Sequence, residues 1–466
     1  MKRRRILPIV AVALLALYCT SDYNVQMKDS EKKFYSGNYL EAARQLLPLV
    51  NKNDQSQLLF MMEAGMMLHT GGEYEKSNKV LLAASDLAEK IALSVSKEAA
   101  SLFVNDTVTN YRGEDFERVL IHMYLGINFL MLDKPDEARV EFKKVDNVLR
   151  GIKESGGSVY KQNLMAKYLY AVAFEISAIA QKDDNDYNDA YVEYKQINQL
   201  DPNFDSVRLD LIRMAKTIGD TEDYAKWRGQ FGALDSAVPA DAGELILIYQ
   251  AGQGAVKKSR GKLLDDVDFK RAIQINLNGM SMAQGVTTAG VIAALALAEN
   301  PIPRFVKRSN KGRVALVSAT GIKQAQTYML EDIENTAVKN MEEQYTKMYV
   351  KAAASIAIKA AASVASGIAA KKVAENVGGT VGQFSGLIGA ATGAGVGAGL
   401  AKTIKPDLRC WHSLPANLQM KRIFLKPGKY DLDLSAAGNE GLVDKKTMSV
   451  TIAPGKKTLI NYRTLF

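Results

Sequence analysis

Histidine, cysteine and tryptophan are scarce in this sequence, with three, two and two residues among 466. The histidines, His69, His122 and His412, do not share the spacing of metal ligands, and neither an HExxH nor a CxxC motif occurs. The G-x-S-x-G signature of a nucleophile elbow is also missing. These absences exclude the common sequence signatures of metal and nucleophilic catalysis. We therefore expect a non-enzymatic protein without a cofactor, a metal or a small-molecule substrate.

The two cysteines are Cys19 and Cys410. If Cys19 carries a lipid, as argued below, Cys410 has no partner within the chain, and the fold does not depend on a disulfide. Free cysteine behaves as a small apolar residue, so we expect Cys410 to be buried.

The net charge of +9 does not indicate a nucleic-acid-binding protein. Four of the cations lie within the first five residues, and without them 56 Lys and Arg stand against 51 Asp and Glu. These charges are interspersed along the chain, whereas nucleic-acid-binding surfaces cluster their cations. We expect no nucleic-acid partner.

The N-terminus has the pattern of a bacterial export signal. Four cationic residues, Lys2 to Arg5, precede an uncharged run from Ile6 to Tyr18, which ends at Cys19. The run is too short for a membrane span, which needs about 20 residues. The terminal cysteine indicates a lipoprotein signal over residues 1–19, with lipidation at Cys19. Because Tyr18 is bulky where a small residue is usual, an uncleaved signal anchor or later cleavage remains an alternative.

Residues 20–235 contain a recurring pattern of small and large residues. Its clearest copy consists of Gly65, Gly72, Tyr74, Ser77, Leu81 and Ala84, and three further copies centre on Ala42, Ala138 and Ala190. Ala42 and Ser77 are 35 residues apart, and the later intervals are 61 and 52 residues. The small residues let two helices approach closely, and the large residues fill the space between neighbouring helix pairs.

This pattern resembles the tetratricopeptide repeat (TPR), whose period is about 34 residues. The resemblance implies an α-solenoid with a groove that binds other proteins. Four residues are candidates to line that groove: Asn105, Asn128, Tyr168 and Tyr191. The alternative is that the aromatic residues belong to the core and the asparagines to turns or caps.

The second half of the chain is expected to mix strands with a glycine-rich helical segment. Residues 236–324 contain two strand-like runs, 244–249 and 313–317, and residues 325–405 are helical by composition. The uncharged stretch from Asn376 to Ala401 holds glycines at four-residue spacing, at positions 378, 382 and 386 and again at 389, 393 and 397. This spacing favours close helix packing. Insertion into a membrane is the alternative.

Residues 406–466 are expected to form a small β-sandwich. Two hairpins are predicted, one between 421–425 and 430–434 and one between 448–452 and 458–462, with turns at Pro427-Gly428 and Pro454-Gly455. The Pro-Gly-Lys-Tyr turn resembles that of small PEGA-type surface modules, which implies a binding or spacer role.

Short phrases along residues 30–430 resemble a family of uncharacterised bacterial TPR-containing envelope lipoproteins. They include Gly72-x-Tyr74-x2-Ser77-Asn78, Glu137 to Glu141, and Arg409 with Trp411 and Pro415. The resemblance implies a location in the bacterial cell envelope and a repeat scaffold. Together with the export signal, it leads us to expect a lipid-anchored protein at the outer membrane that faces the periplasm. The expected fold class is α+β, with an α-solenoid followed by a mixed domain.

The leading hypothesis for the function is a protein–protein interaction scaffold of the envelope, held to the membrane by its lipid. Two alternatives belong to other classes. One is an enzyme acting on cell-wall polymer, with a site near Arg409, Trp411 and His412. The other is a pore or secretion component that inserts the glycine-rich segment.

Overall fold

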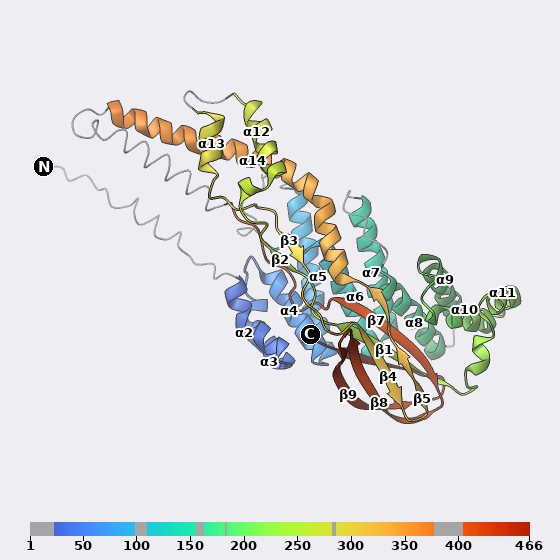
Figure 1. Ribbon diagram of the computed structural model, residues 1–466. Helices are drawn as coiled ribbons and strands as arrows, with labels where there is room; N and C mark the ends of the chain where they lie inside the picture. The colour runs from blue at the N-terminus through green and yellow to red at the C-terminus, as the bar shows by residue number, and fades with distance from the viewer. Residues whose placement is uncertain (1–22, 98–109, 155–162, 182–183, 282–285, 377–403) are drawn as a thin grey trace.

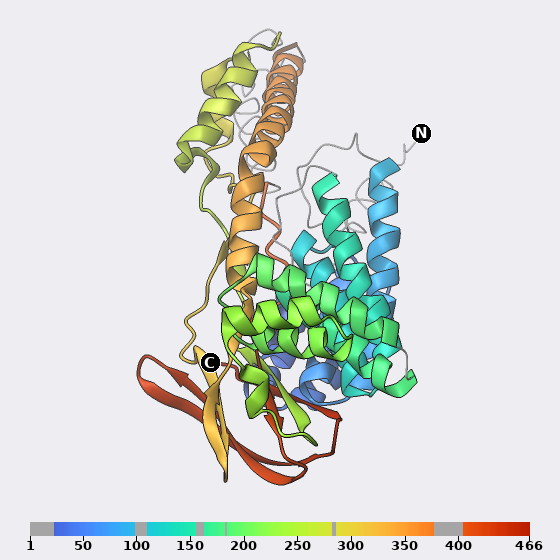
Figure 2. The same cartoon turned by 90° about the vertical axis from the view of Figure 1, so that its right-hand side faces the viewer.

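The computed structural model describes residues 23–97, 110–154, 163–181, 184–281, 286–376 and 404–466. The described chain consists of a helical N-terminal half, two packed β-sheets, and an arm of three helices that projects from them (Figures 1 and 2). Cys19, Asn105 and the glycine ladder between positions 378 and 397 lie outside the described residues.

Ten helices within the described residues form five consecutive pairs. The pairs are α2 (Tyr23–Tyr35) with α3 (Tyr39–Val50), α4 (Gln57–Thr70) with α5 (Tyr74–Lys97), α6 (Asp115–Met131) with α7 (Pro135–Glu154), α8 (Leu164–Gln181) with α9 (Asp184–Leu200), and α10 (Ser206–Thr217) with α11 (Thr221–Phe231). The short α2, α8 and the α10–α11 pair carry no clear copy of the repeat pattern. Their packing on neighbouring pairs nevertheless continues the same array.

The predicted close contacts between small and large residues hold the pairs together. A Cβ atom on Gly65 would lie 2.5 Å from Leu81, and one on Gly126 would lie 2.5 Å from Phe142. The Ser77 hydroxyl donates a hydrogen bond of 2.7 Å to the Gly65 carbonyl oxygen. These contacts confirm the solenoid, because in two helix pairs a glycine admits the large side chain of the partner helix at the predicted positions.

Two four-stranded sheets pack face to face beside the helices. The first has the order β10 (Lys457–Arg463), β1 (Gly243–Ala251), β7 (Asn417–Leu425), β6 (Tyr328–Glu331). The second has the order β5 (Ile322–Gln326), β4 (Val314–Ala319), β8 (Gly428–Gly438), β9 (Gly441–Ile452). In the first sheet β1 is parallel to β10 and antiparallel to β7.

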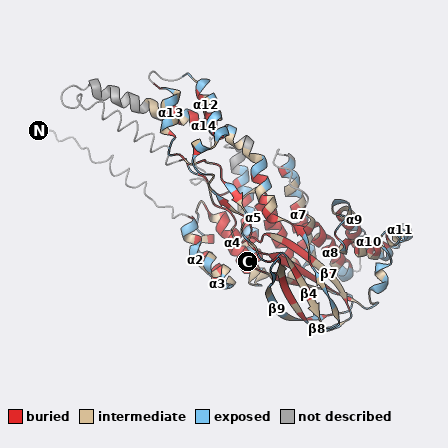
Figure 3. Ribbon diagram, viewed as in Figure 1, coloured by how far each residue is buried: buried red, intermediate tan, exposed pale blue. Residues whose placement is uncertain are grey.

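Strand β1 is buried on both faces, as its continuous apolar run predicts (Figure 3). Ile246 and Ile248 join the core shared with the helices, whereas Leu245 and Leu247 join the core between the two sheets. The first sheet is therefore a middle layer. It separates the helical repeats from the second sheet.

Both predicted hairpins of the C-terminal region are wrong. Strands β7 and β8 belong to different sheets, and so do β9 and β10. The turns at Pro427-Gly428 and Pro454-Gly455 carry the chain from one sheet to the facing one. The hairpin that does form joins β8 to β9 through a turn at Gly438 to Gly441. An alternating strand buries one face in a sandwich whichever sheet it joins, so alternation alone did not select the partner.

The predicted boundaries at 324/325 and 405/406 cut through shared sheets. β1 lies between β10 and β7, and β4 pairs with β8, so strands from residues 236–331 and 417–463 form one sandwich. The helix predicted from residue 325 begins at Ile333, because β5 and β6 occupy the residues before it.

The arm consists of α12 (Val267–Asn278), α13 (Thr288–Ala294) and the 44-residue helix α14 (Ile333–Asn376). A two-stranded ribbon, β2 (Val256–Lys258) with β3 (Arg304–Val306), lies between the arm and the sheets. Figure 2 shows α12 and α13 packed along the distal part of α14. Among the described residues no helix combines the length and the apolar character that crossing a membrane requires.

Candidate functional site on the inner face of the helical repeats

The C-terminal half of the chain packs on one side of the repeats, and we call this side the inner face. Helices α2, α4, α6, α8 and α10 contribute polar side chains to it, and each makes a hydrogen bond or ion pair with a residue of the C-terminal half. Three groups of contacts can be distinguished along this face, and they follow the order of the repeats.

The first group holds an extended segment, residues 407–415, which we call the strap. Two buried carboxylates of the inner face accept backbone N–H groups from it. Glu117 on α6 accepts from Trp411 at 2.8 Å, and Glu63 on α4 accepts from His412 at 2.6 Å and from Ser413 at 3.2 Å. The helices therefore hold the strap by its backbone, in the way that a partner peptide would be held.

Side chains of the strap are also engaged. Arg409 forms a two-pronged ion pair with Asp407 and donates to the Gln55 carbonyl oxygen. Trp411 is 1% exposed, and its ring centroid lies 6.1 Å from that of Tyr124. The His412 carbonyl oxygen accepts hydrogen bonds from Tyr35 and Arg308.

Burial shifts the ionisation of both carboxylates. It raises the pKa of Glu117 to about 7, and the neighbouring Glu114 carboxylate adds to the rise. Burial also raises the pKa of Glu63. The hydroxyl groups of Tyr111 and Tyr23 donate to Glu117 and Glu63 respectively.

The second group centres on His69 of α4. Its Nε2 atom lies 2.6 Å from the Gln250 side-chain amide and 3.0 Å from that of Asn461. Its Nδ1 atom lies 2.5 Å from Asn128 Oδ1. Burial lowers the pKa of His69 to about 4, so the ring is neutral near pH 7. Because Nε2 faces two amide donors, it is the acceptor, and the Nδ1–H group donates a hydrogen bond to Asn128 Oδ1.

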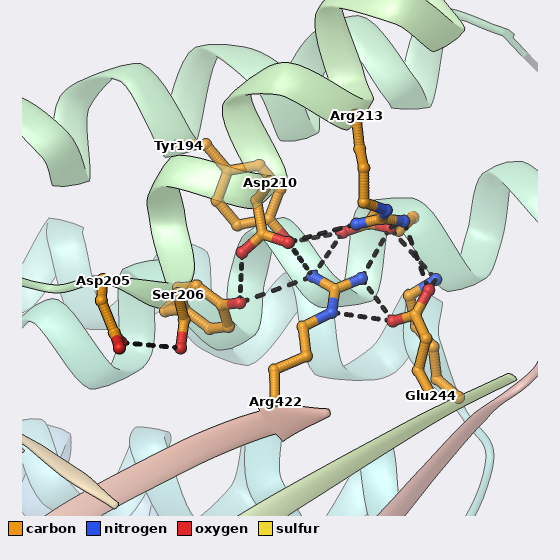
Figure 4. A network of polar contacts seen from close by, with 10 residues as sticks. Tyr194, Asp205, Ser206, Asp210, Arg213, Glu244 and Arg422 are labelled. Carbon is orange, nitrogen blue, oxygen red and sulfur yellow. Dashed lines mark hydrogen bonds and ion pairs between the residues drawn. The ribbon is translucent and has the colours of Figure 1, made fainter. Parts of the chain in front are cut away.

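The third group is a buried ion network around Arg422 of β7 (Figure 4). Its guanidinium group donates to Glu175 on α8 at 2.9 Å and to Glu244 on β1 at 2.8 Å, and lies 3.0 Å from Asp210 on α10. Arg213 and Lys457 complete the network: Arg213 pairs with all three of these carboxylates, and Lys457 pairs with Glu175 and Glu244. Three cations thus face three carboxylates.

The cations hold the pKa values of Glu175 and Glu244 below the usual range, whereas burial raises the pKa of Asp210. Burial alone would raise the pKa of Glu175, but Arg422, Lys457 and Arg213 hold it well below the usual range. Burial would likewise lower the pKa of Arg422, but Asp210 and its neighbours raise it further above the usual range. Removing one member would leave its partners charged inside the protein.

The structure places the four candidate groove residues as follows. Asn128 and Tyr168 lie on the inner face, but both are fully buried beneath the C-terminal half. Tyr191 on α9 points to α11 instead, where its hydroxyl donates to Asp223 and accepts from Trp227. All three side chains are buried, so none of them lines an open groove. Asn105 lies outside the described residues.

Sequence reasoning missed Glu63, Glu117, Glu175 and Arg422. A signal was present, because each of Glu63 and Glu175 is the sole charged residue within a long apolar stretch of its helix. A charged residue is seldom fully buried without a partner, so such isolation indicates a paired internal charge. The partners in the C-terminal half, His412 for Glu63 and Arg422 for Glu175, are 349 and 247 residues away and could not be identified from the sequence.

The residues near which an enzyme site was considered, Arg409, Trp411 and His412, all belong to the strap. A cavity of about 230 Å³ borders its first residue, Asp407, and is also lined by Tyr111, Glu114 and Lys257. Lys257 is paired with Glu114, and Asp407 with Arg409. Within the described residues no group of three or more His, Cys, Asp or Glu is placed to hold a metal ion.

Comparison with known proteins found solved structures only. No protein-family model matches the chain, and no curated protein matches it. A kinesin light chain-like protein of Podosopora anserina with TPR-like repeats is 13% identical, with a TM-score of 0.31, over 46% of this chain and 94% of that one. MamA from Desulfovibrio magneticus RS-1 is 14% identical, with a TM-score of 0.29, over 46% and 95%.

A tetratricopeptide repeat protein from Parabacteroides merdae is 11% identical, with a TM-score of 0.21, over 45% of this chain and 78% of that one. The assignment of the repeat fold rests on the packing of Gly65 and Gly126 described above. The chain is an α+β protein with a TPR-like solenoid and a strand-rich C-terminal half.

Proposed function

We propose that this protein is a non-enzymatic interaction scaffold of the bacterial cell envelope, anchored by a lipid on Cys19 and facing the periplasm. The export-signal pattern that ends at Cys19 supports the anchor. The repeat array supports the scaffold, because stacked helix pairs offer an extended surface to a partner.

One observation carries the scaffold proposal. The inner face is covered, but the outer helices α3, α5, α7 and α9 each expose an aliphatic residue near a cation, and Leu40, Leu93 and Leu200 are exposed elsewhere on three of them. The positions are two and five residues after the small residue of each repeat: Arg44 with Leu47, Lys79 with Leu82, Val140 with Lys143, and Val192 with Lys195. The aliphatic side chains are 38–55% exposed.

This repeated pair defines a row along four helices, which we call the outer row. Single exposed aliphatic residues are ordinary, but here one lies on each of four successive outer helices, at the fifth position after the small residue in α3 and α5 and at the second in α7 and α9. A partner surface with apolar residues flanked by acidic residues would complement the aliphatic side chains and the cations of the outer row. The proposed partner is a protein with such a surface.

Photo-crosslinking in intact cells tests the outer row. A crosslinkable residue at Val140 or Leu82 should capture a distinct envelope protein, and one at the exposed Leu442 on β9 serves as the matched control. The same partner should be lost when Leu82 and Val140 are both changed to Asp. Equal capture at Leu442 would refute the assignment of the outer row.

Lipidation is tested separately. Mass spectrometry of the mature N-terminus should show an acylated Cys19, and the Cys19→Ser protein should leave the membrane fraction on carbonate extraction. An unmodified terminus at another residue would contradict the anchor. Retention of the Cys19→Ser protein in the membrane pellet would favour the alternative in which the glycine-rich segment inserts into the bilayer.

A further inference from the structure

The strap is bound to the helices differently from the strands around it. Strands β1, β7 and β10 pair by backbone hydrogen bonds within a sheet. The strap instead gives three consecutive backbone N–H groups, those of Trp411, His412 and Ser413, to two side-chain carboxylates. Gly254 also donates a backbone hydrogen bond to the Leu414 carbonyl oxygen, and Trp411 packs in the hydrophobic core. Docking therefore depends in part on groups that gain and lose protons.

We propose that residues 407–415 are a reversible strap, which occupies a peptide-binding face formed by α2, α4 and α6 and is released as the pH rises through neutrality. The inference concerns the inner face, so it does not depend on the lipid anchor or on a partner of the outer row. The occupant in the closed state is the chain's own segment. In the open state the face would accept another extended segment with an aromatic residue and a cation.

The carboxylates set the direction of the pH response. In the docked state burial holds the pKa of Glu117 at about 7 and also raises that of Glu63. In the open state both groups would meet water, and their pKa values would return towards the ordinary value near 4.3. The docked state thus binds more protons, so Glu117 weakens docking by up to tenfold per pH unit between about pH 4.3 and 7, and Glu63 acts in the same direction.

His412 acts in the same direction. Its ring Nδ1 lies 3.3 Å from Glu31, an ion pair without the geometry of a hydrogen bond. Burial would lower the pKa of His412, but Cys410, Glu31 and Glu63 raise it well above the ordinary value. The protonated ring stabilises the docked strap at acidic and neutral pH, and this contribution is lost as the pH rises through the docked pKa.

The remaining groups around the strap do not reverse this direction. The groups facing it from the helices, loops and β10 are Tyr23, Glu31, Tyr35, Tyr111, Glu114, Lys257, Arg308 and Arg463, and those on the strap are Asp407, Arg409 and Cys410. The pKa values of Glu31 and Asp407 are lowered, so they titrate at acidic pH. Those of Tyr23 and Tyr111 are raised well above 10.

Tryptophan fluorescence can follow the strap in the full chain. The protein has two tryptophans, Trp227 and Trp411, so Trp227→Phe leaves only the strap residue. We expect quenching of Trp411 by acrylamide to increase at least threefold between pH 6 and pH 8.5, while the far-ultraviolet circular dichroism stays constant. Quenching that stays flat across this range, or that rises only with loss of helical signal, would refute the proposal.

Two glutamate variants test whether Glu117 causes the pH-dependent quenching of Trp411. In the Trp227→Phe background, Glu117→Gln should reduce the pH-dependent change by at least half. The control is Glu141→Gln on α7, because Glu141 is also buried but pairs with His122 and Lys144 away from the strap. Glu141→Gln should leave the pH profile of Trp411 unchanged. An equal effect of both variants would show a general loss of stability and contradict the strap.

Peptide binding tests whether the face can accept an occupant in trans. A labelled peptide of residues 405–416 should bind the full-length Trp411→Ala protein at pH 6 at least tenfold more tightly than the parent, whose own strap competes. The same peptide with alanine at position 411 is the control. Equal weak binding to both proteins, with helical signal retained, would show that the face is not exchangeable.

Discussion

Single charged residues in apolar helices of this protein have partners far away in the sequence. Glu175 on α8 meets Arg422, and Glu63 on α4 meets the backbone of His412 and Ser413. Such buried pairs add little net stability over apolar packing, but loss of one partner is costly. The main effect of these buried pairs is therefore to determine which surfaces pack together, and their net contribution to stability is small.

Arg422 provides the sharpest residue-level test. Arg422→Met removes the cation shared by Glu175, Asp210 and Glu244, and should lower the free energy of unfolding by about 3–5 kcal/mol. The adjacent Lys421 makes a partly exposed ion pair with Asp205, so Lys421→Met should cost about 1 kcal/mol or less. Urea denaturation followed by circular dichroism measures both. Similar losses for the two variants would contradict the network.

His69 should make stability sensitive to acid. Its pKa is about 4 in the folded chain and about 6.5 when unfolded, so the unfolded chain binds the extra proton between these values. The contribution of His69 is complete above pH 6.5, and about 3 kcal/mol is lost as the pH falls towards 4. Nitrogen NMR of the imidazole should show a neutral ring with the proton on Nδ1 at pH 5.5. A ring that titrates near pH 6.5 would contradict this assignment.

At the scale of elements, local patterns predicted the helix pairs and failed for strand pairing. The contacts Gly65–Leu81 and Gly126–Phe142 join helices adjacent in sequence, so the spacing of residue sizes reveals them. The partner of β7 is β1, about 170 residues earlier, and no turn connects them. Alternation in β8 and β9 indicated strands without indicating which sheet each would join. The strap has neither the repeat spacing of the helices nor the alternation of the strands. Its position is seen only from its contacts with Glu63 and Glu117 in the structure.

Gly126 tests the packing of one helix pair. Gly126→Leu places a side chain where a Cβ atom alone would lie 2.5 Å from the Phe142 ring, so overpacking should cost roughly 1–3 kcal/mol. Gly151 on α7 is the matched control, because no atom lies within 4 Å of a Cβ built there. Gly151→Ala should be neutral or stabilising by up to about 1 kcal/mol. Thermal denaturation followed by circular dichroism compares the two variants. An unchanged melting temperature for Gly126→Leu would contradict the packing of α6 on α7.

At the scale of the whole molecule, the two halves of the chain depend on each other. The first sheet buries Ile246, Ile248, Leu418 and Met420 against the helices. The helices bury Glu63, Glu117 and Glu175 against the strap and the sheet. Each half, taken alone, would expose apolar residues and buried charges where the two halves now meet. A repeat array usually gains its stability from neighbouring repeats, but here part of its cover comes from the other half.

Separating the halves tests this dependence. A fragment of residues 23–235 should be strongly helical, because the contacts within each helix pair remain. It should melt at a lower temperature than the full chain, since its inner face loses the apolar cover and the cations that balance Glu175 and Asp210. Coexpression with residues 240–466 should restore the melt, and Arg422→Met in the second fragment should weaken that restoration. A fragment as stable as the full chain, with no gain on coexpression, would show that the repeats stand alone.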